Sequence, residues 1–257
     1  QLEDGDACRC GIVAYDPAMG SWVLGGMFAV TLLAQSVTPG CDPQRSPATT
    51  PPPATPAATF TTQDGVRVQA DAVVSNLEIP WALSFAPDGR LFVAERPGRV
   101  RIFDLTTSAS ELALTLDDVS RQGEAGLLGL ALAPDFAATR HVYLYYTAVT
   151  GNAAVNRIVR YRETGGRLGE RALILDNIPA GTIHDGGRLR FGPDGLLYAT
   201  ARDAANSSLA QDVASLAGKF LRIERDGTTP RANPFGSPVF SWGHRNPQGF
   251  DWHPATG

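Results

Sequence analysis

Short runs of apolar and β-branched residues, separated by tight turns, recur beyond residue 76 of the chain. The two clearest copies, residues 83–94 and 189–200, each place Pro-Asp-Gly between two such runs. Proline fixes φ, aspartate bonds to nearby backbone through its side chain, and glycine accepts positive φ, so this tripeptide favours a tight turn. The pattern therefore predicts a β-hairpin in each copy.

The hairpin pattern is part of an internal repeat. A third copy covers residues 130–147, with Pro-Asp-Phe at the turn, and residues 250–257 begin a fourth. A further apolar strand with alternating Arg or Lys follows each full copy, at residues 98–103, 156–161 and 218–223. Four strands per unit, repeated about every 50 residues, are typical of a β-propeller. We therefore predict an all-β fold; the alternative, a β-sandwich with coincidental turns, is disfavoured by four turns in register.

The number of repeat copies indicates how many propeller blades the chain contains. Three full copies and the first strand of another correspond to roughly three to four blades, whereas closing a propeller ring usually needs about four to eight. The chain also begins with Gln1, which is not a native initiator. We expect the sequence to be a piece of a longer reading frame.

The first 41 residues differ from the rest and resemble a signal segment. Residues 22–34 form an apolar stretch too short to span a bilayer comfortably but suited to a signal h-region. Cys41 follows where a bacterial lipoprotein is lipidated, which makes it a candidate lipid anchor. Pro39 occupies a place where a small residue is usual, so a plain export signal or an uncleaved anchor remains an alternative.

Residues 42–66 are rich in Pro, Thr and Ala and predict an extended linker, and residues 67–257 form the partial propeller domain. A linker between an export site and a folded body predicts an exported protein, periplasmic or extracellular, with membrane tethering if Cys41 is lipidated. The net charge of -4 disfavours a nucleic-acid partner. All three cysteines lie at or before Cys41, so the folded part holds no disulfide.

Residues suited to chemistry lie at the ends of the predicted strands. His184 precedes a glycine pair at the mouth of a strand, where a histidine is a plausible general base. Asp203 follows the other strand of the same hairpin, so it should lie near His184 and hold one imidazole tautomer. Arg245 lies in residues 243–249, which precede the fourth copy much as residues 182–187 precede the third. Equivalent loops of successive blades converge on one end of the central channel and would form one pocket.

Several long motifs occur in the same order as in a known family, at residues 80–89, 126–136, 183–195, 210–212, 218–219, 233–235 and 243–249. From about residue 77 to 257 the chain resembles the soluble quinoprotein sugar dehydrogenases, the glucose/sorbosone dehydrogenase family. The resemblance implies a six-bladed propeller that binds pyrroloquinoline quinone together with calcium. In the family the calcium-binding loop lies beyond the point that corresponds to residue 257, so the metal ligands stay unknown.

The resemblance also implies roles for residues. His184 corresponds to the catalytic base, Asp203 to its orienting carboxylate, and Arg245 with Asn246 to a pair that contacts the quinone. Glu124 corresponds to a loop residue near the cofactor that is often glutamine. The implied reaction oxidises an aldose at the anomeric carbon, with His184 taking the hydroxyl proton and hydride passing to the quinone. The implied partners are a sugar substrate and an external electron acceptor.

Two departures from the family pattern leave other functions open. Arg202 stands where the family usually has glycine, and it would strain the loop if that position needs a positive φ. Glu124 adds a negative charge near an anionic quinone. One alternative is a non-catalytic sugar- or protein-binding propeller. Another is a propeller hydrolase or lactonase, which would need several inward carboxylates around a central metal, and few are visible.

Overall fold

The computed structural model describes residues 58–151, 153–253 and 255, which fall into two compact units, residues 1–78 and 79–257. The described part of the first unit holds one antiparallel hairpin, β1 (Ala58–Thr61) with β2 (Arg67–Ala70). This hairpin crosses the predicted boundary between linker and domain at residues 66 and 67. Cys41 and the signal-like segment lie outside the described residues.

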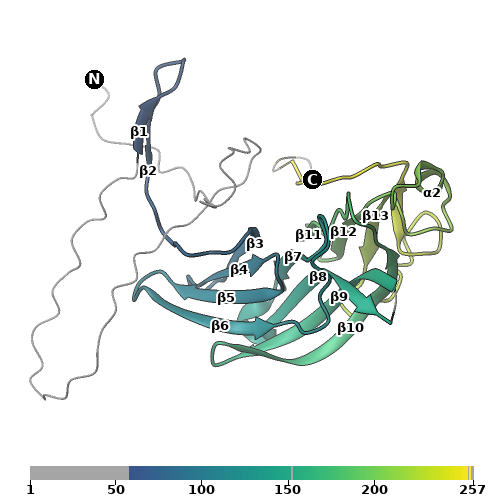
Figure 1. Cartoon of the computed structure of the whole chain (residues 1–257), viewed down its shortest axis with the longest axis horizontal. Helices are drawn as coiled ribbons and strands as arrows, with labels where there is room; N and C mark the ends of the chain where they lie inside the picture. The colour runs from purple at the N-terminus through teal and green to yellow at the C-terminus, as the bar shows by residue number, and fades with distance from the viewer. Residues whose placement is uncertain (1–57, 152, 254, 256–257) are drawn as a thin grey trace, which may run out of the picture. The chain divides into compact units, whose positions relative to one another are not determined.

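The second unit is built from three four-stranded antiparallel sheets, each in simple sequence order (Figure 1). This arrangement confirms the all-β propeller prediction, with each sheet a blade. The first sheet holds β3 (Pro80–Phe85), β4 (Leu91–Glu95), β5 (Arg99–Asp104) and β6 (Ala109–Thr115). The second holds β7 (Leu127–Leu132), β8 (His141–Thr150), β9 (Ala153–Thr164) and β10 (Arg167–Pro179). The third holds β11 (Leu189–Phe191), β12 (Leu197–Ala201), β13 (Lys219–Ile223) and β14 (Val239–Trp242).

The Pro-Asp-Gly turns join the first two strands of the first and third sheets. The amide of Gly89 donates to the carbonyl of Ala86 at 2.9 Å, and Gly89 has φ +84°. Gly195 has φ +77° in the equivalent turn. In the second sheet Phe136 replaces that glycine and begins a one-turn helix, α1 (Phe136–Thr139). The turn chemistry thus explains both the shared hairpins and the one copy that deviates.

The start of the fourth copy differs from its prediction within the described residues. Residues 250–253 form no strand there. Phe250 and Trp252 instead stack edge to face, with ring centroids 5.3 Å apart, and Trp252 packs in the same way on Tyr198 of β12. Residues 250–253 therefore pack on the third sheet and do not form the first strand of a fourth sheet. The other described helix, α2 (Ser207–Gln211), is short like α1, and neither is long and apolar enough to cross a membrane.

Apolar side chains fill the spaces between successive sheets. One core cluster joins the first and second sheets and includes Phe92, Leu127 and Leu144. A second joins the second and third sheets and includes Tyr143 and Leu221. Each such side chain stabilises the fold by about 1.5–3 kcal/mol relative to exposure. This packing fixes the strand ends, and with them the loops that carry the candidate chemistry.

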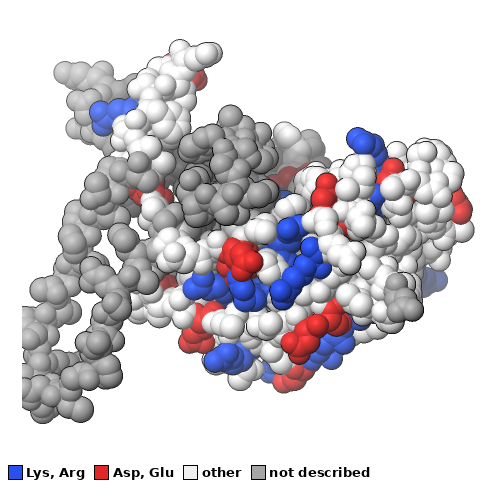
Figure 2. Space-filling model, viewed as in Figure 1, with Lys and Arg blue, Asp and Glu red and all other residues white. Residues whose placement is uncertain are grey.

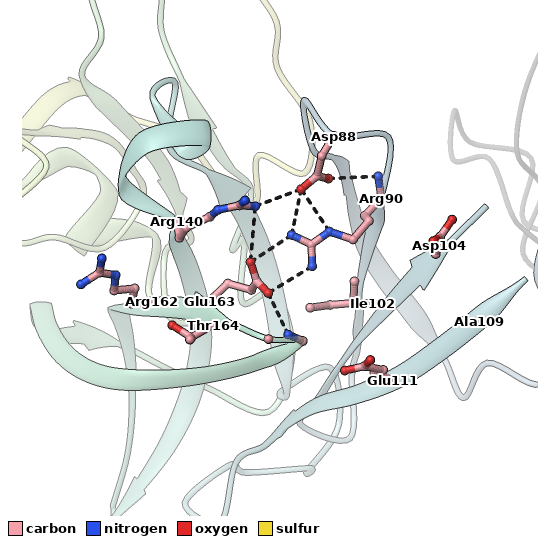
Figure 3. A pocket seen from close by; sticks show the side chains of 12 residues that line it. Asp88, Arg90, Ile102, Asp104, Ala109, Glu111, Arg140, Arg162, Glu163 and Thr164 are labelled. Carbon is pink, nitrogen blue, oxygen red and sulfur yellow. Dashed lines mark hydrogen bonds and ion pairs between the residues drawn. The ribbon is translucent and has the colours of Figure 1, made fainter. Parts of the chain in front are cut away.

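Ion pairs also link the first and second sheets, around a pocket of about 660 Å³ (Figure 3). Arg90 donates two hydrogen bonds to Glu163, at 3.1 and 2.9 Å, and Arg140 lies 2.9 Å from Asp88. The hydrogen bonds from Arg90 hold the pKa of Glu163 below its usual range. Arg90 also donates to Asp88 at 3.1 and 2.9 Å, and these bonds, with a smaller contribution from Arg140, lower the pKa of Asp88 to about 2. We call Asp88, Arg90, Arg140 and Glu163 the Arg90 cluster.

Candidate active site

The loop between β10 and β11 carries His184 and is shaped by its glycines. A Cβ on Gly186 would lie 2.7 Å from the carbonyl oxygen of Thr200, and one on Gly187 would lie 2.6 Å from Cβ of Leu128. Glycine at both positions therefore lets the loop press against its neighbours. His184 itself has φ +60°, an uncommon conformation for a side-chain-bearing residue. The sequence thus builds a tightly packed, locally strained loop at the candidate site.

The imidazole of His184 lies between a carboxylate and a guanidinium. Its Nδ1 is 3.9 Å from Oδ1 of Asp203, which follows β12, and its Nε2 is 3.4 Å from Nη2 of Arg245, which follows β14. The side chains of His184 and Asp203 are mostly buried, being 19% and 9% exposed. The three residues that sequence analysis singled out are therefore brought together by three different strand ends.

Asn246 and Arg245 also hold the backbone of this region together. The amide of Gly186 donates to Oδ1 of Asn246 at 3.2 Å, and the amide of Asp203 donates to the carbonyl of Arg245 at 3.0 Å. The segment after β14 is thus tied to both the His184 loop and the Asp203 turn. Such supporting hydrogen bonds fix the orientation of His184 and Asp203.

Glu124 reaches the same loop from the second sheet. Its carboxylate accepts a hydrogen bond from the amide of His184, and its own amide donates to the carbonyl of Thr182 at 3.0 Å. Gly123 makes this docking possible, because a Cβ there would lie 1.8 Å from the Thr182 oxygen. In this structure the Glu124 carboxylate is therefore engaged with the strained backbone of His184.

Sequence analysis missed Asp185, which is 1% exposed. Its Oδ1 accepts hydrogen bonds from the amide of Gly181 at 3.1 Å and from Asn156 at 3.4 Å. Its Oδ2 has no hydrogen-bond partner in the residues that the structure describes, and burial raises the pKa of the carboxyl. The available signal was Asn156, a polar residue between apolar Val155 and Ile158 in strand β9, which the structure buries completely.

Arg202 is more unusual than its sequence position suggests. It is 0% exposed, and none of its three guanidinium nitrogens has a hydrogen-bond partner among the described residues. Burial lowers its pKa. The strain expected at this position is absent, because positive φ occurs not at Arg202 but at Ala204 and Ala205, +52° and +56°. Asp203 consequently keeps its place beside His184.

The described residues fit the two implied cofactors differently. An anionic quinone would find the guanidinium of Arg245, beside a buried His184 Nδ1 that has no hydrogen-bond partner among the described residues. No group of three or more His, Cys, Asp or Glu suited to a metal ion occurs among the described residues. No calcium ligand is therefore assigned. The face of the molecule drawn in Figure 2 carries both acidic and basic side chains.

The chain is similar to several known proteins. It is 41% identical to the PQQ-bound aldose sugar dehydrogenase of Streptomyces coelicolor, with a TM-score of 0.62, over 68% of this chain and 53% of that one. It is 31% identical to aldose sugar dehydrogenase YliI of Escherichia coli, over 73% of this chain and 54% of that protein. It is 27% identical to quinoprotein glucose dehydrogenase B of Acinetobacter calcoaceticus, over 71% and 45%.

The chain therefore spans about half the length of the curated relatives it matches. The match to the family model of the glucose/sorbosone dehydrogenases covers residues 77–257, which include all three sheets and every residue of the candidate site. The chain belongs to the glucose/sorbosone dehydrogenase family.

Proposed function

We propose that the complete protein is a PQQ-dependent dehydrogenase that oxidises an aldose at its anomeric carbon, by hydride transfer to the quinone and with calcium as a second cofactor. Family membership and the PQQ-bound Streptomyces relative support this proposal. The observation that carries it is the imidazole of His184 held between the Asp203 carboxylate and the Arg245 guanidinium. A base beside a fixed cation suits a reaction that removes a proton next to a developing negative charge.

Each residue of the site has a role in this scheme. Asp203 favours the tautomer with the proton on Nδ1 of His184, which leaves Nε2 free to accept the proton of the anomeric hydroxyl. Arg245, beside Nε2, orients anionic groups and stabilises negative charge there. Pyrroloquinoline quinone, when bound, supplies the hydride acceptor. Loss of the hydroxyl proton and of one hydride converts the anomeric carbon to the carbonyl of a lactone.

We also propose that the protein works outside the cytoplasm and passes electrons to an external acceptor. The apolar stretch at residues 22–34 and the Pro-rich segment after Cys41 support an exported protein, either lipid-anchored at Cys41 or released. Labelling with a radioactive fatty acid in a bacterial host, compared between the parent and Cys41→Ser, tests the anchor. Equal labelling of both proteins would refute it.

The decisive experiment reconstitutes the complete protein with pyrroloquinoline quinone and calcium and measures dye reduction with a panel of aldoses. Turnover should fall by about 100- to 10,000-fold in His184→Ala while the quinone still binds. His141→Ala is the matched control, because His141 begins β8 and belongs to none of the site contacts; it should retain activity. A fully active His184→Ala protein would refute the assigned base.

The competing function is a non-catalytic sugar- or protein-binding propeller. The filled position at Arg202 favours it, because a buried guanidinium occupies space beside the base where the family usually has glycine. The same reconstitution separates the two functions. Quinone binding without turnover of any aldose would support the binding function and overturn the dehydrogenase.

A further inference from the structure

The buried guanidinium of Arg202 lies close to Asp203, the carboxylate beside the proposed base. A Cβ placed on Gly181, at the start of the His184 loop, would be 2.9 Å from Nη1 of Arg202. The guanidinium is therefore tucked against this loop, away from solvent. A buried charge without hydrogen bonds is costly, so its presence calls for an explanation.

The key geometric feature is one carboxylate oxygen shared by two groups. Oδ1 of Asp203 lies 3.7 Å from Nε of Arg202 and 3.9 Å from Nδ1 of His184. Neither distance is a hydrogen bond, and within the described part of the chain Nδ1 of His184 and Nε of Arg202 have no hydrogen-bond partner. The two groups therefore interact with the same negative charge at almost the same distance.

Sharing has a definite electrostatic consequence. A carboxylate beside an imidazole stabilises its protonated form, whereas a nearby cation disfavours it. A guanidinium stays charged at neutral pH, so Arg202 offsets part of the Asp203 charge that would otherwise act on His184. The other charged groups near His184 are Glu124, which accepts a hydrogen bond from the His184 amide, and Arg245, 3.4 Å from Nε2; Asp185 follows His184 in the chain, with its carboxylate bonded to Gly181 and Asn156. These groups are common to any variant at position 202, so a comparison at that position isolates the contribution of Arg202.

We propose that Arg202 is a positioning residue that competes with His184 for Oδ1 of Asp203, and thereby lowers the pH above which the imidazole is free to accept a proton. The proposal deepens the proposed function, since His184 is the base of that reaction. It distinguishes this chain from a site with glycine at the same place, where Asp203 would act on His184 alone.

The test is a titration of the complete protein without cofactor or sugar. The protein is labelled with ¹⁵N-histidine, and the imidazole signals are followed by NMR from pH 4 to 9, a range chosen to bracket an ordinary histidine at about 6.5. The sequence holds four histidines. The signal absent from His184→Gln identifies the residue.

In Arg202→Met the midpoint of the His184 titration should move up by about one pH unit, because Oδ1 of Asp203 then acts on the imidazolium alone. Arg202→Gln should move it in the same direction and serves if the methionine variant does not fold. The acidic limb of the turnover profile should move with the midpoint.

Two controls separate competition from general disturbance. Arg157→Met removes another largely buried arginine, which pairs with Asp176 in the second sheet, and should leave the His184 midpoint unchanged. In an Asp203→Asn background the shift caused by Arg202→Met should shrink, because the shared charge is gone. An unshifted midpoint in both neutral variants, or an equal shift in Arg157→Met, would overturn the proposal. Failure of turnover alone would overturn the dehydrogenase and leave this titration result standing.

Discussion

Two arginine–carboxylate clusters in this molecule have opposite designs. In the Arg90 cluster the guanidinium makes two hydrogen bonds to Glu163, and Asp88 lies 2.9 Å from both Arg90 and Arg140. At the candidate site the guanidinium of Arg202 is more deeply buried and makes no hydrogen bond within the described residues. The first pattern is that of a structural clamp between blades. The second is typical of a functional site, where electrostatics are arranged at the expense of stability.

The loop contacts of the site give the largest expected effect. Gly123→Ala would place a Cβ 1.8 Å from the backbone oxygen of Thr182, so the Glu124 loop must move away from His184. Gly151→Ala is the matched control, because its φ of +60° is nearly that of Gly123 (+59°) and a Cβ there would meet no described atom within 4 Å. Urea denaturation should show that Gly123→Ala costs about 2–3 kcal/mol more than Gly151→Ala. Equal costs would show that only the positive φ matters at position 123.

Removing the cation of the clamp should have the next largest effect. Arg90→Met leaves the mostly buried Glu163 with Arg140 at 3.6 Å and the Gly166 amide at 2.8 Å as its remaining partners. The free energy of unfolding at pH 7 should fall by about 2 kcal/mol, because hydrogen bonds to a charged group are lost. Arg162→Met, in a more exposed pair with Glu170, should cost less than about 0.5 kcal/mol. Equal losses would show that Arg90 does not clamp the sheets.

Acid should weaken the clamp in a predictable window. Folding lowers the pKa of Glu163 and of Asp88, so both carboxylates stabilise the folded state once they are ionised. This stabilisation is complete above their unfolded pKa values, 4.5 for Glu163 and 3.8 for Asp88. It is lost as the pH falls toward their folded pKa values, which for Asp88 is about 2. The parent should therefore lose about 1 kcal/mol more than Arg90→Met between pH 5 and 2, after allowance for solvent screening. Urea denaturation at several pH values measures this difference. Parallel curves for the two proteins would contradict the role of Arg90 in lowering these pKa values.

The sequence supports the fold more fully than the details of the site. Pro-Asp-Gly turns have a local mechanism, so the hairpins at Gly89 and Gly195 follow from nearby residues. His184 and Asp203 could be placed together because one hairpin joins them. The pairing of Arg90 with Glu163 spans 73 positions and depends on how two sheets pack, which no local pattern encodes. The burial of the Arg202 side chain is equally non-local, because it depends on the loop that packs against it.

The smallest expected effect is also the most informative about the comparison. Arg202→Met removes a charge that has been taken out of water and forms no hydrogen bond within the described structure. The guanidinium gains some energy from Asp203 at 3.7 Å, but its desolvation opposes that gain. Methionine is flexible and apolar, and fills such a space without a polar cost. The free energy of unfolding should therefore change by less than about 1 kcal/mol, in clear contrast to Arg90→Met.

Urea denaturation of Arg202→Met and Arg90→Met under one set of conditions makes this contrast measurable. If Arg202→Met lowered the free energy of unfolding as much as Arg90→Met does, Arg202 would also be a structural clamp. It would then have to bind partners other than the contacts described above. A near-zero change, together with a shifted His184 titration, would mean that the side chain acts on the chemistry of the site while adding little to the fold. Stability and titration of the same variant thus separate the two designs.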